Sequence, residues 1–266
     1  MQNKFRAALL LFLASALPAQ ADPPSLWDTY KLLAGKKTVD LTHEFKPGVP
    51  HWKGFPDEQI KPLYLYSRDG FRAERYTFVG QWGTHVDAPA HFHEGLRTVD
   101  EIPPREMIAP LVVINISTRS ADNPDTMLVI EDVKRWESRY GKIPPGAFVA
   151  KRDDWGKRWP DPFLMRNMDV KGRMHYPGWS VEAIRFLVQD RNILAIGHET
   201  TDTDSGANVS DDRYPAETYI LGENRYQIEL LANLDQVPEY GALAVITFPK
   251  PEKGSGFPAR VFAILP

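Results

Sequence analysis

Residues 81 to 91 of the chain read QWGTHVDAPAH, and this stretch brings together side chains that can bind an ion and move a proton. On a β-strand, side chains two positions apart point to the same face, so Gln81, His85 and Asp87 are expected to share one face. Gly83 belongs to the same alternate set, and its missing side chain would leave room for an ion, a water or a substrate. Trp82, Thr84 and Val86 would then face the other way, into packing.

The end of this stretch predicts a turn. Pro89 disfavours continued regular strand pairing, and His91 follows two positions later. The chain can therefore turn and bring His91 back towards the pocket of His85 and Asp87. Imidazole and carboxylate together suit a divalent metal, and a His that is not a ligand can move protons. A hydrogen-bonded structural pair of His85 and Asp87 is the alternative, and the spacing alone leaves both interpretations open.

Composition excludes several classes of protein. The 266 residues carry a formal net charge of −3 and contain no Cys. A nucleic-acid-binding protein needs clustered Lys and Arg, and no basic tract is present. The lack of Cys excludes thiol nucleophiles and Cys-based zinc sites. The length fits one large domain or two small ones, and a single domain of this size needs no disulfides.

The first 21 residues predict an export signal. Lys4 and Arg6 precede an apolar run from 7 to 17, and Ala19-Gln20-Ala21 is a small-residue cleavage pattern. The run is too short to cross a bilayer, for which about 20 residues are needed. We therefore expect a periplasmic or secreted protein, residues 22–266, that has no membrane contact after cleavage. An uncleaved N-terminal anchor is the alternative.

The remaining pattern predicts an α/β fold with a mixed sheet in a single domain. Helices are expected near 27–33, over 130–140 and from an N-cap at Ser180 to Gln189. Strands are expected at 38–42, 72–80, 111–116, 147–151, 193–197, 242–248 and 260–265. Because the two clearest helices lie between strands, the pattern indicates the α/β class.

The stretch from 81 to 91 resembles the signature of the cyclase family, which includes bacterial kynurenine formamidases and isatin hydrolases. The family pattern is His-x-Gly-Thr-His-x-Asp-x-Pro-x-His, and Gln81 stands where the first His is expected. The likeness continues in the segments 39–42, 50–52, 175–180 and 196–202. The resemblance implies a swivelling β/β/α fold, often assembled as a homodimer or homotetramer.

The resemblance also implies a site for one or two divalent ions, zinc or manganese. The family's ligands match His85, Asp87 and Glu229, with Gln81 and Glu217 at the other two ligand positions. Glu217 stands where the family has His, 12 positions before Glu229. Oxygen donors replace imidazole at both Gln81 and Glu217, which favours a manganese-preferring site or a single ion.

The family activity supplies the expected function. We expect a metal-dependent hydrolase of a non-peptide carbon–nitrogen bond in a small amide or lactam, arylformamidase-like, with His91 as general acid and base. The alternative role for His91 is as a ligand to a second ion. Trp52, Phe55 and His175 are the candidate substrate contacts, although each could equally be a core residue. The alternative functions are opening of another cyclic amide or ester, such as isatin or a lactone, and metal or ligand binding without turnover.

Overall fold

A computed structural model describes residues 25–266 of the chain. The export signal predicted for residues 1–21 lies outside the described residues. The chain divides into two compact units after Gly35. In the first, helix α1 (Leu26–Ala34) begins at Ser25, whose hydroxyl accepts a hydrogen bond from the backbone of Trp27. The helix predicted near 27–33 is therefore confirmed.

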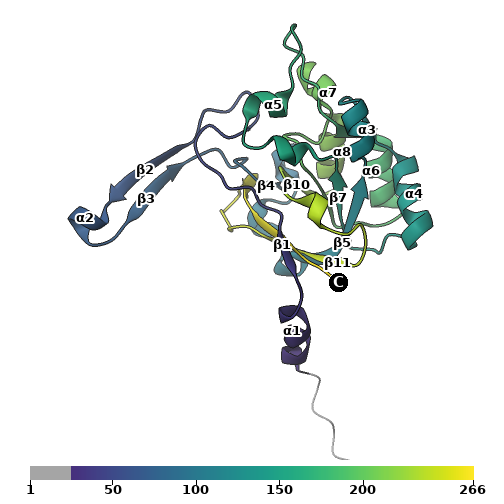
Figure 1. Ribbon diagram of the computed structural model, residues 1–266, viewed down its shortest axis with the longest axis horizontal. Helices are drawn as coiled ribbons and strands as arrows, with labels where there is room; N and C mark the ends of the chain where they lie inside the picture. Colours follow the sequence, from purple (N-terminus) through teal and green to yellow (C-terminus); the bar gives the residue numbers. More distant parts are fainter. Residues whose placement is uncertain (1–24) are drawn as a thin grey trace, which may run out of the picture. The chain divides into compact units, whose positions relative to one another are not determined.

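The second unit, Lys36–Pro266, is built on a curled mixed sheet (Figure 1). Within the described residues the sheet has nine strands in the order β1-β13-β11-β5-β7-β9-β10-β4-β12. The strands β5, β7, β9 and β10 are parallel to one another, and the other pairings are antiparallel. Their bounds are β1 Thr38–Asp40, β4 His85–Asp87, β5 Ile108–Asn115, β7 Phe148–Arg152, β9 Ala195–His198, β10 Tyr226–Glu229, β11 Ala242–Thr247, β12 Gly256–Pro258 and β13 Arg260–Ile264.

Two hydrophobic clusters hold the sheet in place. One is formed by side chains of β5, β7 and β9 together with those of α4 (Ile130–Tyr140), α6 (Val181–Gln189) and α8 (Pro215–Gly222). The other gathers side chains of β1, β4, β5, β10, β11 and β13. Burial of this much apolar surface is the main driving force for the fold. The parallel strands lie at the centre of the sheet, where their carboxyl ends can present side chains to a common site.

The predicted helices and most predicted strands are confirmed. Ser180 caps α6 as expected, since its hydroxyl accepts from the backbone of Ala183, and α4 ends at Gly141 with a φ of 88°. The sequence did not predict α8 or β10, which carry Glu217 and Glu229. The shorter helices are α2 Tyr66–Asp69, α3 Ser117–Asp122, α5 Pro162–Arg166 and α7 Gly206–Ser210, and a small separate sheet joins β6 (Met127–Leu128) to β8 (Gly178–Trp179).

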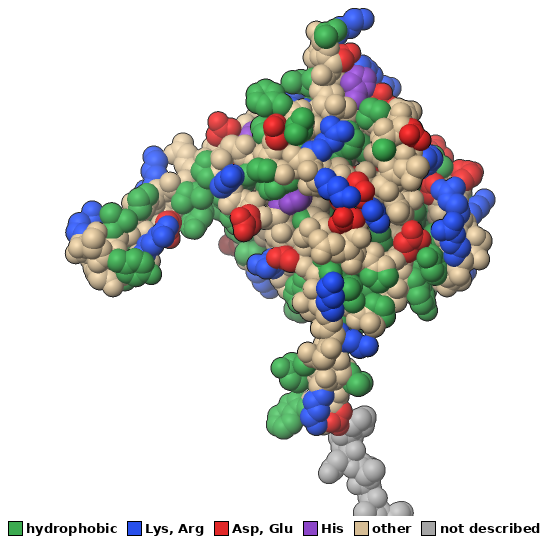
Figure 2. All heavy atoms as spheres, in the orientation of Figure 1, with side chains coloured by type: hydrophobic (Ala, Val, Ile, Leu, Met, Phe, Trp, Pro, Cys, Tyr) green, Lys and Arg blue, Asp and Glu red, His purple; other side chains and the backbone are tan. Residues whose placement is uncertain are grey.

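A two-stranded arm extends from the body of this unit (Figure 1). It consists of β2 (Gln59–Tyr64) and β3 (Ala73–Thr77), with α2 at its tip. The segment 63–76 exposes large apolar side chains, and Figure 2 shows green side chains along the arm. These side chains are Leu63, Tyr64, Leu65, Tyr66, Phe71 and Tyr76. Within residues 25–266 no helix combines the length and the hydropathy that crossing a membrane requires.

Candidate metal centre and active site

The register between β4 and β10 brings the central residues together. Glu229 lies opposite His85, and Gln227 lies opposite Asp87. Because side chains two positions apart share a face, these four side chains point to the same side of the sheet. Both strands are fully buried in the middle of the fold. Neighbouring strands distant in sequence therefore fix the positions of the candidate ligands.

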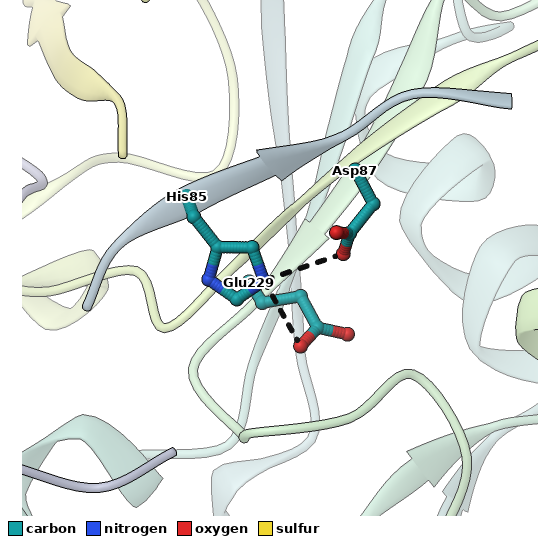
Figure 3. Close-up of side chains that lie close together, drawn as sticks. All are labelled: His85, Asp87 and Glu229. Carbon is teal, nitrogen blue, oxygen red and sulfur yellow. Dashed lines mark ion pairs between the residues drawn. The ribbon is translucent and has the colours of Figure 1, made fainter. Parts of the chain in front are cut away.

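His85, Asp87 and Glu229 form a compact group (Figure 3). The Nε2 atom of His85 is 3.4 Å from Oδ2 of Asp87 and 3.6 Å from Oε2 of Glu229. Each residue offers one ligand atom, and these three atoms all lie within 4.8 Å of one another. One imidazole nitrogen and two carboxylate oxygens at this spacing can bind one divalent ion from one side.

The orientation of the His85 ring is fixed by its other nitrogen. Nδ1 lies 2.7 Å from the carbonyl oxygen of Gly83. A carbonyl oxygen only accepts, so Nδ1 carries the proton and donates it to Gly83. In neutral His85 this leaves the lone pair of Nε2 directed at Asp87 and Glu229. Metal-binding His residues are commonly oriented by such a contact.

Unpartnered polar atoms in the site fit a metal ion. His85 Nε2 and Asp87 Oδ1 are buried and have no hydrogen-bond partner. Leaving a buried polar atom without a partner costs about 1–3 kcal/mol, so such atoms usually mark a ligand or a functional role. His85, Asp87 and Glu229 would hold the ion, and the donor set is suited to a divalent cation.

The electrostatics of the site agree with this interpretation. Burial raises the pKa of Glu229 well above its ordinary range, and the charges of Asp87 and Glu217 add to the rise. Burial would also raise the pKa of Asp87, but the imidazoles of His85 and His91 outweigh it and leave that pKa below its usual range. Burial lowers the pKa of His85, and the facing Asp87 more than reverses this, so the net pKa is raised. Several buried carboxyl groups thus share a small volume that a cation would neutralise.

Glu217 lies in the same cavity but outside the group of three. Asp204 caps the start of α8, accepting hydrogen bonds from the backbone of Ala216 and Glu217 at 3.0 and 3.1 Å. This cap places Glu217 in the first turn of α8, with its carboxylate towards the site. Its Oε1 accepts a hydrogen bond of 3.0 Å from the amide of Gln227. Glu217 as a metal ligand remains a prediction.

Gln81 faces His91. Its amide nitrogen is 3.4 Å from Nδ1 of His91, and both residues line the cavity beside His85. The short helical turn η1 (Pro89–His91) brings His91 back, as the position of Pro89 predicted. This contact involves the amide nitrogen of Gln81 and does not test whether Gln81 binds a metal. Gln81 as a metal ligand remains a prediction.

The cavity has a volume of about 260 Å³ and an aromatic wall. Trp52 and Phe55 line it as predicted, with ring centroids 5.1 Å apart. The indole nitrogen of Trp52 donates to the hydroxyl of Tyr214 at 3.1 Å, which ties the loop of Trp52 to the start of α8. Further residues that line the cavity are His51, Phe92, Thr201, Asp202 and Leu230.

Three expectations need correction. The strand is shorter than predicted, since β4 begins only at His85 and Gly83 has a φ of 60° that no strand adopts. Gly83 also does not open room for a ligand, because a Cβ there would lie 3.1 Å from Cβ of Phe45. His175 is not among the residues that line the cavity. It pairs with Asp125 at 2.8 Å and lies 3.7 Å from Asp169, and neither of these residues lines the cavity.

Two further buried residues, Gln227 and His198, belong to the site. The amide of Gln227 donates towards three carboxylates. The sequence feature that could have indicated Gln227 is its position two residues before Glu229, since side chains at that spacing on a strand share a face. His198 ends β9. Its Nε2 lies 3.3 Å from Oε1 of Glu229, and neither ring nitrogen makes a hydrogen bond. Burial, followed by the charge of Lys151, lowers the pKa of His198 well below its ordinary value.

Comparison with known proteins places this geometry in a family. Residues 39–205 match the family model "Putative cyclase". The chain belongs to the cyclase family. It is 34% identical over 251 residues to isatin hydrolase from Roseibium aggregatum, a match that covers 89% of this chain and 95% of that protein. The resemblance found in the stretch 81–91 is therefore confirmed.

Solved structures agree with the family in fold. Isatin hydrolase A from Ralstonia solanacearum matches with a TM-score of 0.84 and 32% identity, covering 93% of this chain and all of that one. An isatin hydrolase bound to the product analogue thioisatinate matches with a TM-score of 0.82 and 32% identity, covering 90% and 97%. The expected cyclase-like α/β fold is confirmed, and the chain is a metal-dependent hydrolase of this family.

Proposed function

We propose that this protein hydrolyses the carbon–nitrogen bond of a small aromatic lactam such as isatin. The observation that carries the proposal is the buried group of His85, Asp87 and Glu229 at the floor of a cavity walled by Trp52 and Phe55. Similarity to isatin hydrolases over most of the chain supports a cyclic amide as substrate. Arylformamide hydrolysis breaks the same kind of bond and is the second candidate.

The size and lining of the cavity support a flat, ring-bearing substrate. A volume of about 260 Å³ suits a small bicyclic molecule and is too small for a peptide segment. The aromatic wall would contact the ring faces, since aromatic pairs are stable at centroid distances of about 4.5–7 Å. This contact would direct the reacting carbonyl towards His85, Asp87 and Glu229.

The chemistry adds water to the amide carbonyl and breaks the ring C–N bond. A divalent ion held by His85, Asp87 and Glu229 would supply Lewis-acid chemistry, polarising the carbonyl and acidifying water. Asp87, as one of the residues that would hold the ion, would also orient the attacking water. The products are a carboxylate and an aromatic amine, so the leaving nitrogen must gain a proton.

We propose that His91 supplies that proton. Nδ1 of His91 lies 3.4 Å from the amide nitrogen of Gln81. His91 lines the cavity beside Asp87 and can take a proton from water and pass it to the leaving nitrogen. The alternative role of His91 as a second metal ligand would leave this proton without a carrier.

A substrate panel tests the proposal. Purified protein supplied with Mn²⁺ or Zn²⁺ is assayed with isatin, formanilide, an aromatic lactone and an aliphatic lactam. We expect isatin to be opened fastest, formanilide more slowly, and the aliphatic lactam least, because it lacks a ring for the aromatic wall. Turnover of the lactone without turnover of either amide would contradict the proposal.

Location and assembly are proposed on separate grounds. We propose export to the periplasm or the medium, because residues 1–21 have the pattern of an export signal.

We also propose a homo-oligomer, because the arm formed by β2 and β3 exposes a row of large apolar side chains. An isolated two-stranded hairpin is at best marginally stable in water, and contact with a second copy would cover it.

A further inference from the structure

Asp202 has one carboxylate oxygen that no protein group uses. It follows β9 and lines the cavity, although the residue is only 5% exposed. The hydroxyl of Tyr176 donates to its Oδ2 at 2.5 Å, and the hydroxyl of Thr201 donates to the same atom at 2.8 Å. Both donors thus lie on one oxygen, and no donor in the described part of the chain reaches Oδ1.

The surroundings of Asp202 hold this orientation. Tyr176 is completely buried, and the hydroxyl of Thr200 donates to the backbone carbonyl of Asp202 at 2.8 Å. Burial raises the pKa of Asp202, and the hydroxyl groups of Tyr176 and Thr201 counter this rise. A cation at the metal centre would favour the charged carboxylate further. An oxygen held in this way without a partner usually marks a ligand-binding role.

The position of Asp202 suits the nitrogen of a bound amide. Asp202 lines the same small cavity as His85, Asp87 and Glu229 but is not one of these three candidate metal ligands. The nitrogen and the oxygen of an amide are bonded to the same carbon atom. A substrate whose carbonyl faces the metal centre therefore has its nitrogen close by, and an N–H group there needs an acceptor inside the cavity.

Glu217 is the other carboxylate of the cavity outside the three candidate metal ligands. In the described residues its side chain has one hydrogen bond, from the amide of Gln227 to Oε1 at 3.0 Å. Two hydroxyl groups hold the carboxylate of Asp202. Because an acceptor that is already fixed loses less entropy on binding, Asp202 is the better partner for an N–H group.

We propose that Oδ1 of Asp202 accepts a hydrogen bond from the N–H group of the substrate and so selects amides and lactams that carry a hydrogen on the nitrogen. Tyr176 and Thr201 are positioning residues, which leave Oδ1 as the free acceptor. The nitrogen keeps its hydrogen when the C–N bond breaks, so the amine product still donates to Asp202. This inference rests on the proposed function and names the group that its substrate must carry.

The test compares two ligands of the same shape. Oxindole carries the ring N–H of a lactam, and 2-indanone has a CH₂ group in its place. Their affinities for the metal-loaded wild type and variants are measured by calorimetry. In Asp202→Asn the donors Tyr176 and Thr201 retain the amide oxygen, so the NH₂ group faces the cavity. Asp204→Asn is the matched control, because Asp204 is a buried carboxylate that caps α8 and does not line the cavity.

We expect the wild type to bind oxindole more tightly than 2-indanone. In Asp202→Asn the ratio of the two affinities should fall about ten- to hundredfold, the effect of losing a hydrogen bond to a charged acceptor. The carbonyl groups of the two ligands differ in the same way for every variant, so the change in the ratio measures the N–H contact. Asp204→Asn should keep the wild-type ratio, because a purely structural loss weakens both ligands equally.

An unchanged ratio in folded Asp202→Asn would overturn the inference. Circular dichroism establishes the fold, and Asp202→Ala is judged on the same ratio if Asp202→Asn does not fold. A fall in the ratio for Glu217→Gln in place of Asp202→Asn would assign the N–H group to Glu217 and would also overturn it. A wild type that opens no amide of the substrate panel but shows the expected fall in Asp202→Asn would overturn the proposed function and leave this contact standing.

Discussion

The Nδ1 atom of His85 donates to the carbonyl oxygen of Gly83, two residues earlier, at 2.7 Å. The backbone at Gly83, whose carbonyl makes this contact, has a φ of 60°, which glycine adopts readily and other residues do not. A single glycine therefore sets the direction of the imidazole that faces Asp87 and Glu229. The glycine of the stretch 81–91 acts through its backbone and not through empty space beside the ligands.

The substitution Gly83→Ala should weaken metal binding. The left-handed conformation costs an alanine about 1–2 kcal/mol, and its Cβ would press on Phe45 at 3.1 Å. The carbonyl that orients His85 would shift, and we expect a loss of about tenfold in metal affinity. Calorimetric titration of the metal-free protein with Mn²⁺ measures this loss.

The matched control for this change is Gly172→Ala. Gly172 has a φ of 80°, and no atom lies within 4 Å of the Cβ position. It should lose similar stability without any change in metal affinity. Equal metal affinity in the two variants would show that Gly83 does not orient His85.

Replacement of Tyr214 by Phe should impair substrate binding more than turnover. It removes the hydroxyl that accepts from Trp52 at 3.1 Å and so frees the aromatic wall. One neutral hydrogen bond contributes about 1 kcal/mol, which corresponds to about a fivefold rise in KM. Steady-state kinetics with isatin separate KM from kcat. Tyr219→Phe, which loses the bond from Gln189 on the surface, is the control, and equal KM values in both variants would refute the role of Tyr214.

The stability of the fold should depend on the protonation of His43. Burial lowers the pKa of His43 to about 4, and its ring stacks on Trp159 at 4.4 Å. Between its ordinary pKa of 6.5 and 4 the unfolded chain binds a proton that the folded chain does not. Stability contributed by neutral His43 is therefore present above pH 6.5 and is lost as the pH falls towards 4.

Urea unfolding of wild type and His43→Asn at about pH 7 and about pH 5 isolates this contribution. The wild type should lose more free energy of unfolding than the variant, by at most about 1.4 kcal/mol per pH unit for one proton. Identical losses in the two proteins would mean that His43 is protonated in the folded state.

Removal of apolar side chains from the arm should dissociate the proposed oligomer. Tyr66 and Phe71 are both exposed near the tip of the arm, so Tyr66→Ser with Phe71→Ser leaves the core intact. Analytical ultracentrifugation should show an oligomer for the wild type and a monomer for the double variant. Val170→Ser, at a fully exposed residue of another loop, should remain oligomeric. A wild type that sediments as a monomer would refute the proposal.

Sequence alone predicted the helices and strands whose apolar residues recur with a clear period. It also predicted the candidate site residues of the stretch 81–91. The helix 130–140 and the helix that begins at Ser180 carry clear apolar faces and capping residues. The sequence alone could not show that Glu229 lies opposite His85, because strand register depends on partners about 140 positions apart. The pairing of His175 with Asp125, 50 positions earlier in the chain, could not be predicted from the sequence either.

The central claim is that His85, Asp87 and Glu229 hold the ion on which hydrolysis depends, and Asp87→Asn tests it most directly. The substitution keeps the shape of the side chain and removes its charge. We measure bound metal and isatin opening for wild type and variant, each after chelation and again after addition of Mn²⁺. The wild type should lose turnover on chelation and regain it with the ion. Folded Asp87→Asn should bind no stoichiometric metal and turn over at least about a hundredfold more slowly. Isatin opening by the chelated variant at the wild-type rate would contradict the claim.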